Sequence, residues 1–291
     1  MSVAMDFMKF CSNLKIKNKG VISEIYKKIT KRLNKDFWNN VSETSHSLYV
    51  GSFGRDTAIH GFSDLDMIFQ LPSKIYKRFN NYSNNGQSAL LQEVKNSILK
   101  TYPNTDIGGD GQVVVISFTN GIQFEVVPAF INDVGSYTYP DSNNGGKWKI
   151  TNPKPEINEI DKIDKMYHLN LKRLCRMMRA WKDKWTVSIG GLLIDTLACN
   201  FIKNWEHREK SFPYYDKLSC DFFNFLSNQD RDQQFWKALG SNQPVKRIGL
   251  FENKAEKCYN LSLEAIEYES EGYIRLSKQK WGEIYGSEFP S

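Results

Sequence analysis

Apolar and polar residues follow two different periods in the first half of the chain. Between residues 21 and 33 apolar side chains recur at every fourth position and predict a helix; they are Val21, Ile25, Ile29 and Leu33. SLYVGSFGR (47–55) predicts a short strand that ends in a glycine-rich turn, and DLDMIFQL (64–71) alternates as a strand. Helical spacing returns in SALLQEVKNSILKTY (88–102), after a loop over 82–87.

The clearest hairpin of the sequence lies between residues 113 and 130. VVVISF (113–118) and IQFEVVPAF (122–130) flank an Asn120-Gly121 turn. Asn-Gly between two β-rich runs is the strongest short-range hairpin signal. The next segment, SYTYPDSNNGGKW (136–148), is rich in turn-forming residues, and we interpret it as a long loop.

The pattern changes after Pro155. IDKMYHLNLKRLCRMMRAWKDKW (163–185) has apolar residues at helical spacing and predicts one long helix. IGGLLIDTLACNFIKNW (189–205) predicts a second helix that is apolar on most sides and therefore central. We expect an α/β lobe over residues 1–150, N-terminal helix included, and a helical lobe over residues 151–291.

Composition excludes several classes of protein. Of 291 residues, 40% are hydrophobic and 25% are charged, as in ordinary globular proteins, and no apolar run approaches the length of a membrane span. The N-terminal sequence lacks the pattern of a signal peptide, so we expect a cytoplasmic location. Five scattered cysteines without a CxxC pair predict reduced thiols in or near a core, rather than disulfides or a zinc site.

The formal net charge of +6 leaves two interpretations open. Lysines are concentrated in KIKNKG (15–20) and KKITKR (27–32). They either form the solvated face of a helix or attract polyanions such as nucleoside triphosphates or nucleic acid. Charge alone does not separate these interpretations.

Two aspartates in the strand over 64–71 are the first candidates for chemistry. Residues two apart on a strand point to the same face, so Asp64 and Asp66 project side by side. Leu65 and Met67 then face apolar packing. Carboxylates held this close repel one another unless a proton or a cation lies between them. Hard oxygen ligands of this kind suit Mg²⁺ together with substrate phosphates.

Gly51 and Ser52 supply a candidate phosphate-binding turn upstream of the aspartates. Glycine lets backbone N–H groups approach a ligand closely, and a following helix N-terminus favours anions. The hydroxyl of Ser52 adds a donor. A phosphate-binding turn beside a Mg²⁺ site is the arrangement that nucleotidyl transfer requires.

A two-metal site usually has a third carboxylate, and Glu125 is the best candidate. It lies in an otherwise apolar strand, where a charge is costly unless it is paired or bound to a metal. Gln123 and Val127 share its face, so the alternative is a glutamate that faces solvent. Asp106 and Asp110, in loop-like sequence before the hairpin, are weaker candidates.

The segments GSFGR, SDLDMIF and FEVVPAF together resemble the polymerase-β-like nucleotidyltransferases. Within that superfamily the chain resembles the bacterial CD-NTases of the SMODS type, relatives of cyclic GMP-AMP synthase and oligoadenylate synthase, over most of its length. The residues that match the core motif are Gly51, Ser52, Asp64 and Asp66. Glu125 stands where the family places its third metal ligand, often an aspartate. The resemblance implies an α+β fold, with a mixed-sheet core, a helical C-terminal lobe and the active site in the cleft between them.

KWKITNP (147–153) resembles the family's segment that helps to read a nucleobase. This makes Thr151 and Asn152 candidate base contacts, and the Asn amide offers both a donor and an acceptor. A turn cap before Pro153 is the alternative.

RMMRAWK resembles the helix that gives the family a basic contact to the donor triphosphate. Arg179 occupies the place where a lysine is usual, and Lys182 lies one turn away. Ser188 is a further candidate phosphate contact, with helix N-capping as the alternative.

The resemblance implies an enzyme that uses Mg²⁺ or Mn²⁺, with two ions per active site. It would join nucleoside triphosphates (ATP, GTP or UTP) into a cyclic di- or trinucleotide and release pyrophosphate. Its product would activate a separate effector protein in anti-phage (CBASS) signalling. We expect a monomer that needs neither a membrane nor nucleic acid. The alternatives are a nucleotidyltransferase acting on a tRNA, a protein or a small molecule, and a non-catalytic nucleotide or RNA sensor.

Overall fold

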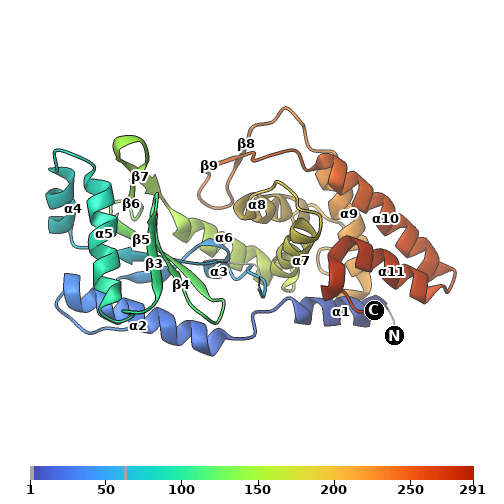
Figure 1. Ribbon diagram of the computed structural model, residues 1–291. Coiled ribbons are helices and arrows are strands. Elements are labelled where there is room, and N and C mark those ends of the chain that lie inside the picture. Colours follow the sequence, from blue (N-terminus) through green and yellow to red (C-terminus); the bar gives the residue numbers. More distant parts are fainter. Residues whose placement is uncertain (1–2, 62–63) are drawn as a thin grey trace. The chain divides into compact units, whose positions relative to one another are not determined.

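The chain groups into two compact units. The computed structural model describes residues 3–61 and 64–291 (Figure 1). Residues 17–54 and 64–153 form the sheet unit, and the described residues of 1–16, 55–63 and 154–291 form the helical unit. The division expected from the sequence lay at residue 150 and kept the N-terminal helix in the first lobe. The helix predicted over residues 21–33 lies in the sheet unit, whereas the described residues before position 17, which include a helix that was not predicted, group with the helical unit.

A mixed sheet forms the centre of the sheet unit. In the described residues its order is β1-β2-β5-β4-β3, and β6 pairs with both β5 and β7. Strand β2 runs parallel to β5, and the other pairs are antiparallel. The bounds are β1 Ser47–Tyr49, β2 Leu65–Gln70, β3 Asp106–Asp110, β4 Val113–Ser117, β5 Gln123–Ile131, β6 Tyr137–Asp141 and β7 Lys147–Thr151.

Helix α5 (Gly86–Leu99) packs against β3, β4, β5 and β6, and α2 (Lys19–Phe37) packs against α5 (Figure 1). Alternate residues of the central strands are buried, which leaves the positions between them for a polar face. The buried ones include Leu65, Met67, Phe69, Val114, Ile116, Phe124 and Val126. The unit also contains α3 (Gly51–Gly54), α4 (Ser73–Asn80) and a 3₁₀ turn (Asn143–Gly145).

The predicted helix over 21–33 and the predicted hairpin over 113–130 are both confirmed. In α2 the buried stripe differs at one position: Val21 is 45% exposed and Ile22 is buried in its place. In the hairpin, Gly121 has φ +80° and the Phe118 N–H donates to the Ile122 carbonyl at 2.9 Å. The Asn-Gly signal therefore located the turn.

Two segments that were interpreted as loops are strands. Residues 136–148 contain most of the β6–β7 hairpin, in which Tyr137 is buried and Gly145 and Gly146 turn the chain with φ near +90°. Asp106–Asp110 forms the edge strand β3. Turn-forming residues dominated both sequences and obscured the short alternating runs beside them. The loop over 82–87 also ends early, because α5 begins at Gly86 with Asn85 as its N-cap.

The helical unit is built from helices around an aromatic core. Its largest fully buried side chains include Trp181, Trp281, Tyr215, Tyr285, Phe7 and Phe10. Helix α10 packs against α9 and α11, and α7 packs against α8. The bounds are α1 Val3–Asn13, α6 Pro153–Met166, α7 Asn170–Lys184, α8 Gly191–Ile202, α9 Tyr215–Ser227, α10 Glu252–Ser270 and α11 Ile274–Tyr285. A short hairpin, β8 (Phe235–Lys237) and β9 (Pro244–Lys246), and 3₁₀ turns at Phe212–Tyr214 and Gly286–Glu288 complete the described elements.

The long helix predicted over 163–185 is wrong, because two helices occupy this segment. Helix α6 ends at Met166 and α7 begins at Asn170, and His168 and Leu169 between them have positive φ. Met166 and Leu169 are about half exposed rather than buried. Because both helices have apolar faces, the period alone did not reveal the break. The second prediction is confirmed, since α8 is largely buried.

All five cysteines are buried free thiols, as predicted. Within the residues that the structure describes, no helix has both the length and the apolar character needed to span a bilayer.

Candidate active site on the sheet unit

The turn at Gly51 is held directly against Asp66. The Val50 N–H donates to the Asp66 carbonyl at 3.0 Å, and the Gly54 N–H donates to the Val50 carbonyl at 2.8 Å, which closes the single turn of α3. Gly51 has φ +60°, and a Cβ at this position would overlap the Asp66 carboxylate. Both the conformation and the close approach therefore require glycine.

Asp66 and Glu125 are direct neighbours across two parallel strands. They pair in the β2–β5 register, and both side chains are partly exposed while Leu65, Phe124 and Val126 beside them are buried. Asp64 is exposed and lies immediately before β2. The structure thus places the predicted third carboxylate beside Asp66, rather than in an unrelated part of the sheet.

The pKa of Glu125 reflects its burial and the acidic side chains around it. Burial of its carboxyl, followed by the negative charges of Asp66, Asp64 and Asp110, raises the pKa of Glu125 to about 7. A carboxylate with acidic neighbours keeps its proton more tightly, because like charges disfavour its ionised form. A bound cation would reverse that preference. The site is therefore chemically suited to a divalent cation.

The carboxylates also fit the coordination habits of magnesium. In the described residues, no group of three or more His, Cys, Asp or Glu side chains is arranged to hold a metal ion by itself. Mg²⁺ usually binds through one or two carboxylates and completes its octahedron with water and substrate phosphates. Asp66 and Glu125, with Asp64 at the head of β2 and the Gly51 turn alongside, fit a metal that binds together with a triphosphate.

The two weaker acidic candidates differ in their surroundings. Asp110 ends the edge strand β3 and contributes to the raised pKa of Glu125, so it lies within electrostatic reach of the pair. Asp106 begins the same strand and pairs with Ser117. Both are exposed.

The candidate base contacts lie where β7 ends. Thr151 is the last residue of β7 and pairs with Tyr137 of β6. Asn152 follows it and immediately precedes α6, which is the place that the turn-cap alternative requires. Both side chains are partly exposed.

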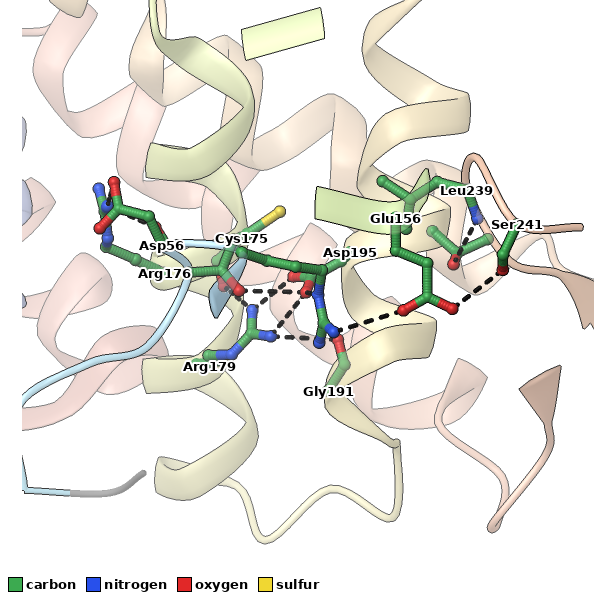
Figure 2. Close-up of polar contacts among 12 residues, drawn as sticks. Asp56, Glu156, Cys175, Arg176, Arg179, Gly191, Asp195, Leu239 and Ser241 are labelled. Carbon is green, nitrogen blue, oxygen red and sulfur yellow. Dashed lines mark hydrogen bonds and ion pairs between the residues drawn. The ribbon is translucent and has the colours of Figure 1, made fainter. Parts of the chain in front are cut away.

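Arg179 is buried in the helical unit and its guanidinium is already engaged. Nη1 donates to the Asp195 carboxylate at 2.6 Å and to the Cys175 carbonyl, and Nη2 donates to Asp195 at 2.9 Å and to the Gly191 carbonyl (Figure 2). Arg179 is only 5% exposed. This geometry assigns Arg179 to the packing of α7 on α8, in contrast to the expected phosphate contact.

Lys182 and Ser188 remain accessible in the same unit. Lys182 is partly exposed in the last turn of α7, and Ser188 is exposed. The N-cap of α8 is Gly190, so the N-capping alternative for Ser188 does not hold.

Asp195 is the residue that sequence reasoning missed. It is fully buried and contacts Arg55 as well as Arg179. A signal was available, because Asp195 is the only charged residue between Ile189 and Ile202. A lone charge in an apolar helix is costly unless it has a partner.

The chain is similar to known proteins in both sequence and fold. Residues 1–164 match the family described as "Second Messenger Oligonucleotide or Dinucleotide Synthetase domain". A protein of Bacillus cereus (strain VD146) named "Probable cyclic nucleotide synthase" is 23% identical over 273 residues, which cover 83% of this chain and 81% of that protein.

Solved structures show the same fold at low sequence identity. CdnC of E. coli MS115-1, solved with ATP, has a TM-score of 0.68 and 12% identity, covering 100% of this chain and 99% of that one. The CD-NTase CdnG of Bradyrhizobium diazoefficiens, solved with GTP, has a TM-score of 0.67 and 8% identity, covering 97% and 94%. The predicted α+β fold with a mixed sheet and a set of helices is confirmed, and it is the fold of these CD-NTase structures.

Proposed function

Because the chain belongs to the Second Messenger Oligonucleotide or Dinucleotide Synthetase family of nucleotidyltransferases, we propose that it makes a cyclic di- or trinucleotide from nucleoside triphosphates. The acceptor hydroxyl attacks the α-phosphate of the donor, a phosphodiester bond forms, and pyrophosphate leaves. A later attack by a hydroxyl of the linear intermediate on the α-phosphate of its own remaining triphosphate closes the ring and releases a further pyrophosphate. The observation that supports this most directly is the pairing of Asp66 with Glu125 beside the Gly51 turn.

Asp66 and Glu125, with Asp64, are the residues that would hold Mg²⁺ or Mn²⁺. When bound, the two ions would neutralise the triphosphate and lower the pKa of the attacking hydroxyl. Glu125 would release its proton on binding, because its raised pKa arises from burial and negative neighbours. The backbone N–H groups of the Gly51 turn and the Ser52 hydroxyl would bind and orient the donor phosphates.

Other residues of this proposal come from the family resemblance. Lys182 and Ser188 are proposed phosphate contacts of the helical unit, and Thr151 and Asn152 are proposed base contacts. Activation of an effector protein in anti-phage signalling and a cytoplasmic location belong to the same proposal.

Incubation with all four nucleoside triphosphates and Mg²⁺ or Mn²⁺ tests this function. Mass spectrometry should find a phosphatase-resistant cyclic product with no added acceptor, together with released pyrophosphate. The Asp64→Ala/Asp66→Ala variant should stay folded and yield neither. Turnover that requires a tRNA, protein or small-molecule acceptor would favour the acceptor-specific alternative, and the absence of pyrophosphate with every mixture would favour the sensor.

A further inference from the structure

Three consecutive residues after α3 are held by side chains of the helical unit. Arg55 is 5% exposed and Thr57 is fully buried. Between them Asp56 has φ +54°, pairs with Arg176 at 3.0 Å, and accepts a second bond from Arg176 at its backbone carbonyl (Figure 2). A segment with two buried residues and an ion-paired residue between them is fixed more tightly than an ordinary connecting loop.

Asp195 is the centre of the contacts that anchor Arg55 and Thr57. Its Oδ2 accepts from Arg55 Nε at 2.8 Å, from Thr57 Oγ1 at 3.1 Å and from Arg179 Nη2 at 2.9 Å, while Oδ1 accepts from Arg179 Nη1. Burial alone would raise the pKa of Asp195, but the Arg179 and Arg55 guanidiniums hold this pKa well below its usual value. Asp195 is therefore ionised in the folded protein.

A second carboxylate balances the charge of the network. Glu156 Oε2 lies 3.7 Å from Arg55 Nη1. Glu156 Oε1 accepts from the Ser241 hydroxyl at 2.9 Å (Figure 2). Two guanidiniums, of Arg55 and Arg179, thus face two buried carboxylates. Such a balanced and hydrogen-bonded cluster can stay buried at a tolerable free energy, whereas removing one partner leaves an uncompensated charge.

The anchor begins one residue after the candidate phosphate-binding turn. Helix α3 is four residues long, from Gly51 to Gly54, and Arg55 is the next residue. A helix rises about 1.5 Å per residue, so the anchored residue lies roughly 6 Å along the helix axis from Gly51. Gly51 in turn has no free space against Asp66. A shift of Arg55 would therefore reach Gly51 and Ser52 through a single turn of helix.

We propose that Asp195 is a positioning residue: through Arg55 and Thr57 it fixes the end of α3 and thereby the geometry with which Gly51 and Ser52 meet a triphosphate. This inference rests on the proposed function for its effect on substrate. Its structural part, the immobilisation of α3, does not depend on any reaction.

The test compares variants of the network with a matched ion pair elsewhere in the helical unit. Thr57→Val removes the hydroxyl that donates to Asp195 at nearly constant volume, Thr57→Ser keeps the hydroxyl, and Asp195→Asn removes the central charge. Glu252→Gln is the control, because Glu252 pairs with Arg247 at 2.6 Å and both of these side chains are also buried. The readouts are amide hydrogen exchange over residues 51–57 and the KM and kcat for nucleoside triphosphates.

Loss of a buried hydrogen bond changes an equilibrium constant by roughly fivefold. Thr57→Val should therefore speed amide exchange in α3 and raise the KM by about that factor, with a smaller change in kcat. Thr57→Ser should restore the wild-type exchange rate and KM. Asp195→Asn should change both quantities by more than Thr57→Val does. Glu252→Gln should lower the unfolding midpoint without changing either readout.

If exchange over residues 51–54 is the same in Thr57→Val and Glu252→Gln as in the wild type, the anchor does not position α3 and the inference is wrong. The exchange measurement needs no turnover, so it tests the anchor even in a protein that makes no product. Faster exchange with an unchanged KM would overturn the link to substrate while leaving the proposed function standing.

Discussion

The two charged clusters of this chain are built in opposite ways. On the sheet unit, Asp64, Asp66 and Glu125 bring like charges together near solvent, and the pKa of Glu125 rises to about 7. In the helical unit, Asp195 is fully buried but meets two guanidiniums, and its pKa falls. In the folded protein the carboxylates of the sheet-unit cluster repel one another, whereas the charges of the helical-unit cluster nearly cancel.

This difference separates a ligand-binding role from a structural one. Like charges that repel in the empty protein are tolerated where a ligand of opposite charge relieves them, which is why perturbed carboxylates mark functional sites. A buried balanced network instead serves the fold, since its charges are already compensated. Removing one member should therefore lower mainly the activity in the first cluster and mainly the unfolding free energy in the second.

Asp66→Asn should show the largest effect. Loss of a carboxylate that is proposed to hold the metal should lower the rate of pyrophosphate release by roughly a thousandfold, because metal ions supply several kcal/mol of transition-state stabilisation. The unfolding midpoint in EDTA should stay unchanged or rise, since one repulsive charge is gone. A variant that loses stability together with activity would show that the acidic cluster is structural.

Arg179→Met should act on stability. It leaves Asp195 with Arg55 as its remaining guanidinium partner, and breaking a buried pair costs about 3–5 kcal/mol of unfolding free energy. Chemical denaturation measures this cost. Lys182→Met, in the last turn of the same helix, is the matched control: it should raise the KM for nucleoside triphosphates and leave stability within about 0.5 kcal/mol. The reverse outcome would restore Arg179 as the phosphate contact expected from the sequence.

Gly51→Ala tests the turn beside Asp66. A non-glycine residue with positive φ costs about 1–2 kcal/mol, and here the new Cβ would also displace the Asp66 carboxylate. Gly121→Ala is the control, because Gly121 has φ +80° with open space around it. Both variants should lose stability in thermal unfolding, Gly51→Ala more than Gly121→Ala, but only Gly51→Ala should lose pyrophosphate release. Equal activity in both would separate the Gly51 turn from the site.

The sheet-unit cluster was predictable because its signals are local. The alternation of Asp64-Leu65-Asp66-Met67 fixed which side chains share a face, and the Asn-Gly hairpin placed Glu125 in a strand. What the sequence did not contain was the β2–β5 register that pairs Asp66 with Glu125. The resemblance to a known family supplied that expectation.

The network in the helical unit was not predictable by the same means. Arg179 looked like a free basic residue because its partner lies 16 residues later on another helix, and Arg55 is 140 residues from Asp195. Helical periodicity identifies apolar faces, but it does not show which buried charges meet. The isolated charge of Asp195 in an apolar helix was the only local sign that a partner existed.

The pH dependence of stability should also distinguish the clusters, and it is the smallest of the expected effects. The pKa of Glu125 is about 7 in the folded protein and ordinarily 4.5, so the folded state binds the proton more tightly. Its protonation therefore favours folding most below pH 4.5, and this contribution is lost as the pH rises toward and past 7. In EDTA, the unfolding midpoint of the wild type should fall relative to Glu125→Gln between pH 5 and 8.

Glu93→Gln is the control, because this carboxylate contacts Arg78 rather than other carboxylates. The unfolding midpoint of Glu93→Gln should follow that of the wild type between pH 5 and 8. Addition of Mg²⁺ at pH 8 should raise the midpoint of the wild type more than that of Glu125→Gln, since a cation compensates the charge that burial and neighbours penalise. A wild type and a Glu125→Gln variant with parallel pH profiles would mean that the three carboxylates do not interact, and the contrast between the clusters would then lose its physical basis.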